Sequence, residues 1–254
     1  MAGFSLADGT IYQISTRGGM TAVITDTALM ASVGIEVDEV RNRLLVANSD
    51  RDSSTGAAML GIYDLGSGER LAMVDLSGSV EDAPGDANYF ANDVAVSAAG
   101  VAFVTDTRMS LIYKVDTYYR ASVLVDFGRE SGFNLNGIEY NPEGYLIAVS
   151  SGTGQLIRIP VDNPQRWSIV DIDFPATGGD GLVWAADGGL VSTSNNTSSV
   201  MKYASDDHWM SARLTGMASF EGQATIAAAV GSEIFVVQPH FGDADPPEIV
   251  RARF

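Results

Sequence analysis

The chain repeats itself with a step of 44 residues. Four positions open the same phrase, a small or polar residue with an apolar residue two positions later, and they are spaced by that step (136−92, 180−136, 224−180): Asn92, Asn136, Asp180 and Ala224. A second set, basic residues inside apolar runs, keeps the same step (158−114, 202−158): Lys114, Arg158 and Lys202. Two separate registers with one period indicate a duplicated structural unit.

The repeated unit is built from strands. Short runs alternate between apolar and polar residues and are separated by Gly, Asp, Asn and Ser, with almost nothing at a helical period. A repeat of about 40 to 50 residues with several strands predicts a β-propeller, because a twisted four-stranded sheet buries both faces only when neighbours stack around an axis. We therefore predict an all-β chain, a six-bladed β-propeller that forms a single domain over residues 1–254.

The two ends of the chain depart from this pattern. The N-terminal piece begins in what the pattern indicates is the second strand of a blade, near Phe4, and the final unit ends after its third strand. The first and last blades can therefore be incomplete in this chain.

Composition narrows the range of partners. The 254 residues are 46% hydrophobic, which is ample for a core, and there is no cysteine, which excludes disulfides, thiolate metal sites and cysteine nucleophiles. The formal net charge of −17 argues against a nucleic-acid partner, which requires a basic patch. No apolar run has membrane-spanning length, so no membrane partner is expected. A small-molecule partner remains, while the compartment and the oligomeric state stay open.

Three ordered motifs carry a resemblance over nearly the whole chain: Phe90–Val96 with Phe103–Asp106 after it, Leu135–Ile138, and Gly179–Leu182. The chain resembles the SMP-30/gluconolactonase/LRE-like family of six-bladed propellers. The resemblance implies a divalent cation, usually calcium, in a central channel. It implies that a Glu from the first blade and Asn, Asn and Asp from later blades hold this cation. The last three fall on Asn92, Asn136 and Asp180.

The position of these residues supports the same conclusion on physical grounds. The start of an innermost strand lies beside the propeller axis, so side-chain oxygens from successive blades converge there. Two amide carbonyls and one carboxylate suit a hard cation that prefers oxygen ligands. The alternative is that Asn and Asp precede strands only because they favour turns. A preference for turns can explain one such residue, but it explains three residues at the same position of successive repeats less well.

The chain also departs from the family pattern. Val33 and Ala224, at the equivalent positions of two other units, cannot bind a cation, and the Glu of the first blade has no counterpart. Glu36 and Glu139 lie three residues past the register, so we expect them to point along or behind their strands. Because affinity falls with the charge of the ligand set, we predict that calcium or another divalent cation binds weakly or not at all.

The chemistry that the resemblance implies is hydrolysis of a lactone or a related ester in the central channel. A bound cation polarises the carbonyl, and a carboxylate takes the proton from the attacking water, a role we assign to Asp180. Asp106, Asn195 and Asn196 are expected to open on the same face and contact substrate. His240, in a loop near this face, is either a surface histidine or a further proton-transfer group.

Two other functions remain open. Propellers host many tasks, so the chain can be a binding or scaffold propeller without catalysis, or a metal-free relative of the strictosidine-synthase-like propellers. The signatures of other hydrolases and of nucleotide-binding proteins are missing, including G-x-S-x-G, H-E-x-x-H and G-x-x-x-x-G-K-[ST]. Turnover that a chelator abolishes distinguishes the metal-dependent hydrolase from both alternatives.

Overall fold

The computed structural model describes residues 2–4, 9–15, 19–52, 54–240 and 247–254. These residues form two compact units, Met1–Asn134 and Leu135–Phe254. In the described ranges the regular elements are β-strands and four 3₁₀ helices of three residues each: η1 (Glu39–Arg41), η2 (Ser77–Ser79), η3 (Arg129–Ser131) and η4 (Pro164–Arg166). None of the described helices is long and apolar enough to cross a membrane.

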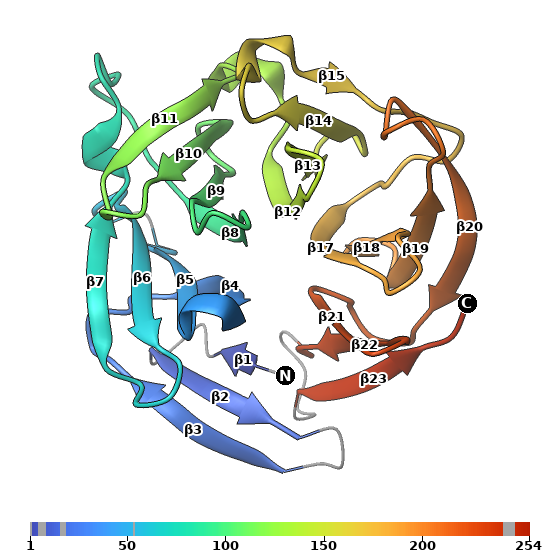
Figure 1. The fold of residues 1–254 in the computed structure, drawn as a ribbon, viewed down its shortest axis with the longest axis horizontal. Helices are drawn as coiled ribbons and strands as arrows, with labels where there is room; N and C mark the ends of the chain where they lie inside the picture. The colour runs from blue at the N-terminus through green and yellow to red at the C-terminus, as the bar shows by residue number, and fades with distance from the viewer. Residues whose placement is uncertain (1, 5–8, 16–18, 53, 241–246) are drawn as a thin grey trace. The chain divides into compact units, whose positions relative to one another are not determined.

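The first unit contains three antiparallel sheets, each formed by strands that follow one another in the chain (Figure 1). The first sheet has three strands, β1 (Ala2–Phe4), β2 (Thr10–Ile14) and β3 (Met20–Thr25). The second comprises β4 (Ser32–Asp38), β5 (Arg43–Ser49), β6 (Ala58–Asp64) and β7 (Arg70–Asp75). The third comprises β8 (Ala91–Val96), β9 (Ala102–Asp106), β10 (Leu111–Val115) and β11 (Ala121–Asp126).

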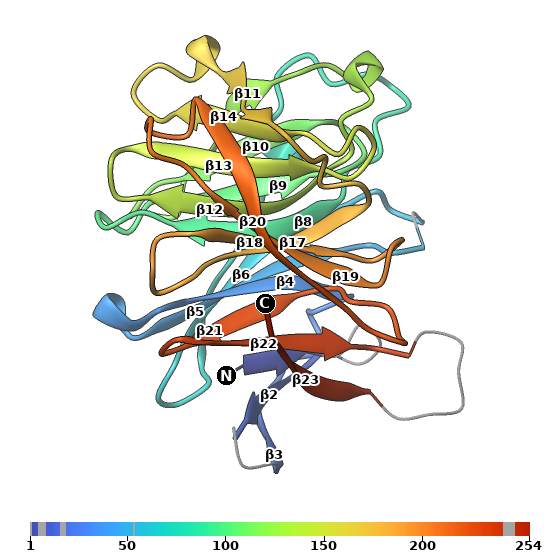
Figure 2. The same cartoon turned by 90° about the vertical axis from the view of Figure 1, so that its right-hand side faces the viewer.

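The second unit repeats this design. Its first sheet comprises β12 (Leu135–Asn141), β13 (Tyr145–Ser150), β14 (Leu156–Pro160) and β15 (Ser168–Ile169). Its second comprises β17 (Gly179–Trp184), β18 (Leu190–Ser194), β19 (Ser199–Ala204) and β20 (Ser211–Ser219), with β16 (Asp171–Ile172) parallel to β20. Its third comprises β21 (Ala227–Val230), β22 (Glu233–Gln238) and β23 (Glu248–Ala252), which lie side by side in Figure 2.

The two end sheets have three strands each. The chain passes from β3 to β4 as it passes from β7 to β8, from the last strand of one sheet to the first strand of the next. Among the described residues, strands β1–β3 therefore correspond to the second, third and fourth strands of a four-stranded sheet. Strands β21–β23 correspond to the first three.

Apolar side chains fill the space between successive sheets within each unit. Ile11 and Ile24 of the first sheet pack with Leu44 and Val46 of the second. In the second unit, Leu156 and Leu182 belong to one cluster that joins two sheets. This packing explains the alternation in the sequence, because each central sheet must bury both of its faces against neighbours.

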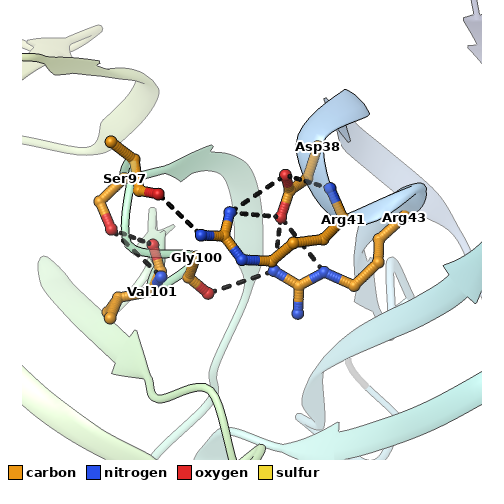
Figure 3. A network of polar contacts seen from close by, with 7 residues as sticks. Asp38, Arg41, Arg43, Ser97, Gly100 and Val101 are labelled. Atoms are coloured by element: carbon orange, nitrogen blue, oxygen red, sulfur yellow. Dashed lines mark hydrogen bonds and ion pairs between the residues drawn. The ribbon is translucent and has the colours of Figure 1, made fainter.

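A buried ion-pair network joins two sheets of the first unit (Figure 3). Asp38, at the end of β4, accepts hydrogen bonds from the guanidinium groups of Arg41 and Arg43, with an Arg43 Nη2 to Asp38 Oδ2 distance of 2.6 Å. The same arginines donate to the carbonyls of Ala98 and Gly100, in the turn between β8 and β9. Burial of Asp38 opposes ionisation, but the hydrogen bonds from Arg43 and Arg41 outweigh it and hold the pKa of Asp38 below its usual range.

Candidate functional site

The repeated polar residues sit on β-bulges. Asn92, Asn136 and Asp180 are each the second residue of the first strand of a sheet. In each first strand, two consecutive residues are left out of the pairing with the second strand: 92–93 in β8, 136–137 in β12 and 180–181 in β17. A bulge of this kind bends the strand and redirects a side chain, and such bulges concentrate next to functional sites. The sequence predicted the register but not the bulge.

Threonine hydroxyls support two of these bulges. The backbone N–H of Asp93 donates to Thr105 Oγ1 at 3.2 Å, and the backbone N–H of Gly181 donates to Thr193 Oγ1 at 2.8 Å. The two threonines are 88 residues apart (193−105), which is twice the repeat step. The bulge is therefore part of the repeated unit.

Glycine follows the polar residue where two first strands approach closely within a unit. A Cβ on Gly137 would clash with the Asp180 carbonyl and lie 2.7 Å from the backbone N of Leu182. A Cβ on Gly181 would lie 3.0 Å from Thr225 O on the following segment, and one on Gly34 would lie 2.5 Å from Asn92 O. The missing side chain allows backbone to pack on backbone at these positions.

Replacing Gly137 by alanine tests this contact. We expect Gly137→Ala to lower the unfolding free energy by about 1–3 kcal/mol, the usual range for a side chain forced into a packed site. The control is Gly85→Ala, whose new Cβ would meet nothing within 4 Å. Urea denaturation of both variants measures the difference, and equal stability would show that β12 and β17 can separate freely.

In the second unit, Asp180 is a half-buried carboxylate surrounded by amides. Asn195 Nδ2 donates to Asp180 Oδ2 at 3.4 Å, and the side chain of Asn136 hydrogen-bonds to the same carboxylate. Burial raises the pKa of Asp180 to about 7, and the hydrogen bonds from Asn195 and Asn136 oppose that rise. In the described part of the chain, no lysine or arginine contributes to lowering this pKa. The structure thus brings together three of the predicted residues around an uncompensated negative charge.

This environment fits a hard divalent cation. The side chains of Asn136 and Asp180 offer only oxygen ligands, and a positive charge beside Asp180 would offset the cost of burying its ionised form. The described residues contain no cluster of three or more His, Cys, Asp or Glu side chains placed to hold a metal ion. A cation site here would therefore depend on amide oxygens and one carboxylate.

In the first unit, Asn92 lies at the equivalent position of β8 and donates from Nδ2 to Thr107 Oγ1 at 2.8 Å. Two acidic residues lie beside it. The carboxylate of Asp93 packs against Gly34, since a Cβ there would lie 2.5 Å from Asp93 Oδ1. Glu36, two residues further along β4, shares this face, and burial together with the charge of Asp93 raises the pKa of Glu36 to about 8. Glu36 therefore lies on the face of β4 that meets Asp93, and the expectation that its side chain points along or behind the strand stays a prediction.

Asp106 has a structural role in place of the predicted substrate contact. Its side chain is fully buried at the end of β9. It accepts hydrogen bonds from the Tyr113 hydroxyl at 2.9 Å and from the backbone N–H groups of Phe90, Arg108 and Met109. These contacts organise the turn after β9 and leave the carboxylate no exposed surface for a ligand. The sequence signal, an Asp at a strand end, does not distinguish a turn-organising residue from a binding residue.

The remaining predicted residues lie in loops of the second unit. Asn196, next to Asn195, is exposed and lies beside Gly178. A Cβ added at Gly178 would lie 2.8 Å from the Cβ of Asn196. His240 follows β22, and its Nε2 lies 3.4 Å from Glu248 Oε1 on β23. Contact of either residue with a substrate, and a catalytic role for His240, stay predictions.

Comparison with known proteins defines the class of fold. No protein-family model matches the chain, and no curated protein matches its sequence. Solved structures do match. Virginiamycin B lyase from Staphylococcus aureus has a TM-score of 0.62 at 11% identity, over 91% of this chain and 71% of that chain. The Malassezia sympodialis allergen Mala s 1 has a TM-score of 0.76 at 17% identity, over 97% and 87%. A luciferin-regenerating enzyme has a TM-score of 0.63 at 12% identity, over 94% and 80%.

At this level of identity the similarity shows the fold and nothing finer. The chain has an all-β propeller fold. Two of the three similar proteins are named as enzymes, a lyase and a luciferin-regenerating enzyme. The particular family suggested by the sequence motifs stays a prediction.

Proposed function

We propose that this protein is a divalent-metal-dependent hydrolase that acts on a lactone or a related ester. The observation that carries the proposal is the environment of Asp180. Burial raises the pKa of this carboxylate to about 7. Two amides stabilise its ionised form, and no cationic side chain among the described residues does so. Such strongly perturbed groups concentrate at functional sites. Two of the similar propellers are named as enzymes, so the fold is compatible with catalysis.

Asn136 and Asp180 would hold the cation, and Asn92 is a further candidate ligand because it has the same register in the repeat. When bound, a cation such as calcium would polarise the carbonyl of the substrate as a Lewis acid. A cation beside Asp180 would favour its ionised form, which can accept the proton of the attacking water at a carboxylate oxygen. Asn195 holds this carboxylate in place, and His240 remains a candidate for proton transfer. A six-bladed propeller with incomplete end blades is part of the proposal.

Calcium titration by calorimetry, on protein first treated with chelator, tests the metal. We expect a dissociation constant on the order of 10⁻⁴ to 10⁻³ M, the range of calcium sites with few charged ligands. A panel of aldonolactones and aryl esters, assayed with calcium and with chelator, tests the chemistry. Turnover that chelator leaves unchanged would reject the metal. Calcium binding without any turnover would favour a binding propeller.

A further inference from the structure

A second polar position accompanies each candidate ligand at a fixed distance in sequence. The partners lie 15 residues after the ligands (107−92, 151−136, 195−180) and therefore follow the same 44-residue step: Thr107, Ser151 and Asn195. The structure pairs them directly. Asn92 Nδ2 donates to Thr107 Oγ1 at 2.8 Å, Asn136 Nδ2 donates to Ser151 Oγ at 3.1 Å, and Asn195 Nδ2 donates to Asp180 Oδ2 at 3.4 Å. Each partner directly follows the second strand of the sheet that holds its ligand.

The chemistry of the partner matches the chemistry of the ligand. Where the ligand is an amide, the partner is a hydroxyl that accepts a hydrogen bond from its NH₂ group. Where the ligand is Asp180, which can only accept when ionised, the partner is the amide of Asn195, which donates. The partner therefore changes from acceptor to donor where the ligand changes from amide to carboxylate.

Ser151 shows why this fixes the direction of an amide. A serine hydroxyl has one proton, and Ser151 donates it to the carbonyl of Gly179 at 2.6 Å. Its oxygen can therefore only accept from Asn136, so the NH₂ group of Asn136 must face Ser151. The carbonyl oxygen of Asn136 is the atom that could bind a cation, and it is then turned away from Ser151.

We propose that Ser151 and Asn195 are positioning residues, which hold the side chains of Asn136 and Asp180 so that their oxygens are presented to a divalent cation. Thr107 holds the amide of Asn92 in the same way within the first unit. This inference rests on the proposed function for the identity of the ligand. The orientation of the Asn136 amide is a property of the protein without a cation. Residues that orient metal ligands typically change metal affinity by about 10–100-fold when removed.

The test uses Ser151→Ala and Ser151→Thr in the full chain. Calcium calorimetry should give a dissociation constant about tenfold higher for Ser151→Ala and close to wild type for Ser151→Thr, which keeps the hydroxyl. Ser150→Ala is the matched control, because that hydroxyl accepts hydrogen bonds from Thr153. Thermal unfolding of all variants identifies any that are merely destabilised.

A second readout does not need calcium. The side-chain NH₂ signals of Asn136 in ¹⁵N NMR, assigned by their loss in Asn136→Asp, should exchange with solvent faster in Ser151→Ala than in wild type or Ser151→Thr. Equal exchange in all three would overturn the positioning role, whether or not calcium binds. Absence of calcium binding in wild type, with the expected exchange pattern, would reject the metal of the proposed function and keep the orientation of Asn136. Unchanged calcium affinity in Ser151→Ala would keep the metal and overturn the inference.

Discussion

Arg43→Ala should destabilise the first unit by about 3–5 kcal/mol, the usual cost of removing one partner of a buried ion pair. The side chains of Asp38 and Arg43 are only 3% and 8% exposed, so the variant leaves a buried carboxylate without its closest cation. It also removes the hydrogen bond from Arg43 to the Gly100 carbonyl, which joins two sheets. Urea denaturation followed by hydrogen exchange of the first unit measures the loss.

The control is Arg129→Ala, which removes an ion pair with Asp86 whose two side chains are 41% and 77% exposed. Exposed pairs contribute about 0–1 kcal/mol, so this variant should be nearly as stable as wild type. The pKa of Asp38 is lowered in the folded state, so the contribution of its ion pair is present at neutral pH and is lost as the pH falls below 3.8 and Asp38 takes up a proton. Similar losses for Arg43→Ala and Arg129→Ala would contradict the importance of the buried network.

Asp180→Asn should have opposite effects on binding and on stability. Calcium binding should weaken by about 100-fold or more, because the variant removes the only charged ligand proposed in the second unit. Stability in chelator should increase at pH 8. Burial raises the pKa of Asp180 from 3.8 to about 7, so between these values the folded state holds a proton that the unfolded state has released. Wild-type stability must therefore fall as the pH rises through this window, and asparagine avoids that loss.

Urea denaturation of wild type and Asp180→Asn in chelator, at pH 5.5 and pH 8, measures the second effect. The stability advantage of the variant should be larger at pH 8 than at pH 5.5. An advantage that does not grow with pH would show that the carboxylate is not strained by burial. Calcium affinity that survives the substitution would place the cation elsewhere.

Much of the fold could be predicted because the repeat is explicit in the sequence. The alternation of apolar residues located the strands, and the 44-residue step placed Asn92, Asn136 and Asp180 at the same position of successive sheets, as the structure has them. The period of the apolar residues reveals the strands because a sheet that buries its faces needs apolar side chains at regular positions.

The details of the site depend on contacts that a sequence pattern does not contain. Strand alternation placed Glu36 away from the site, but the close approach of β4 to β8 at Gly34 brings its face against Asp93. Asp106 looked like a ligand-binding residue, and only its four hydrogen bonds identify it as part of a turn. The bulges and the partners Thr107 and Ser151 were also missed, although the 15-residue offset that relates each partner to its ligand was present in the sequence.

The glycine contacts have a consequence for how such a scaffold can change its chemistry. Where Gly34, Gly137 and Gly181 let main chain rest on main chain, the spacing of adjacent blades does not depend on the residue that precedes the glycine. That preceding position holds Val33, Asn136 and Asp180 in these three cases. An apolar, an amide or an acidic group can thus be exchanged there without rebuilding the support, which makes the position suitable for engineering new ligand preferences.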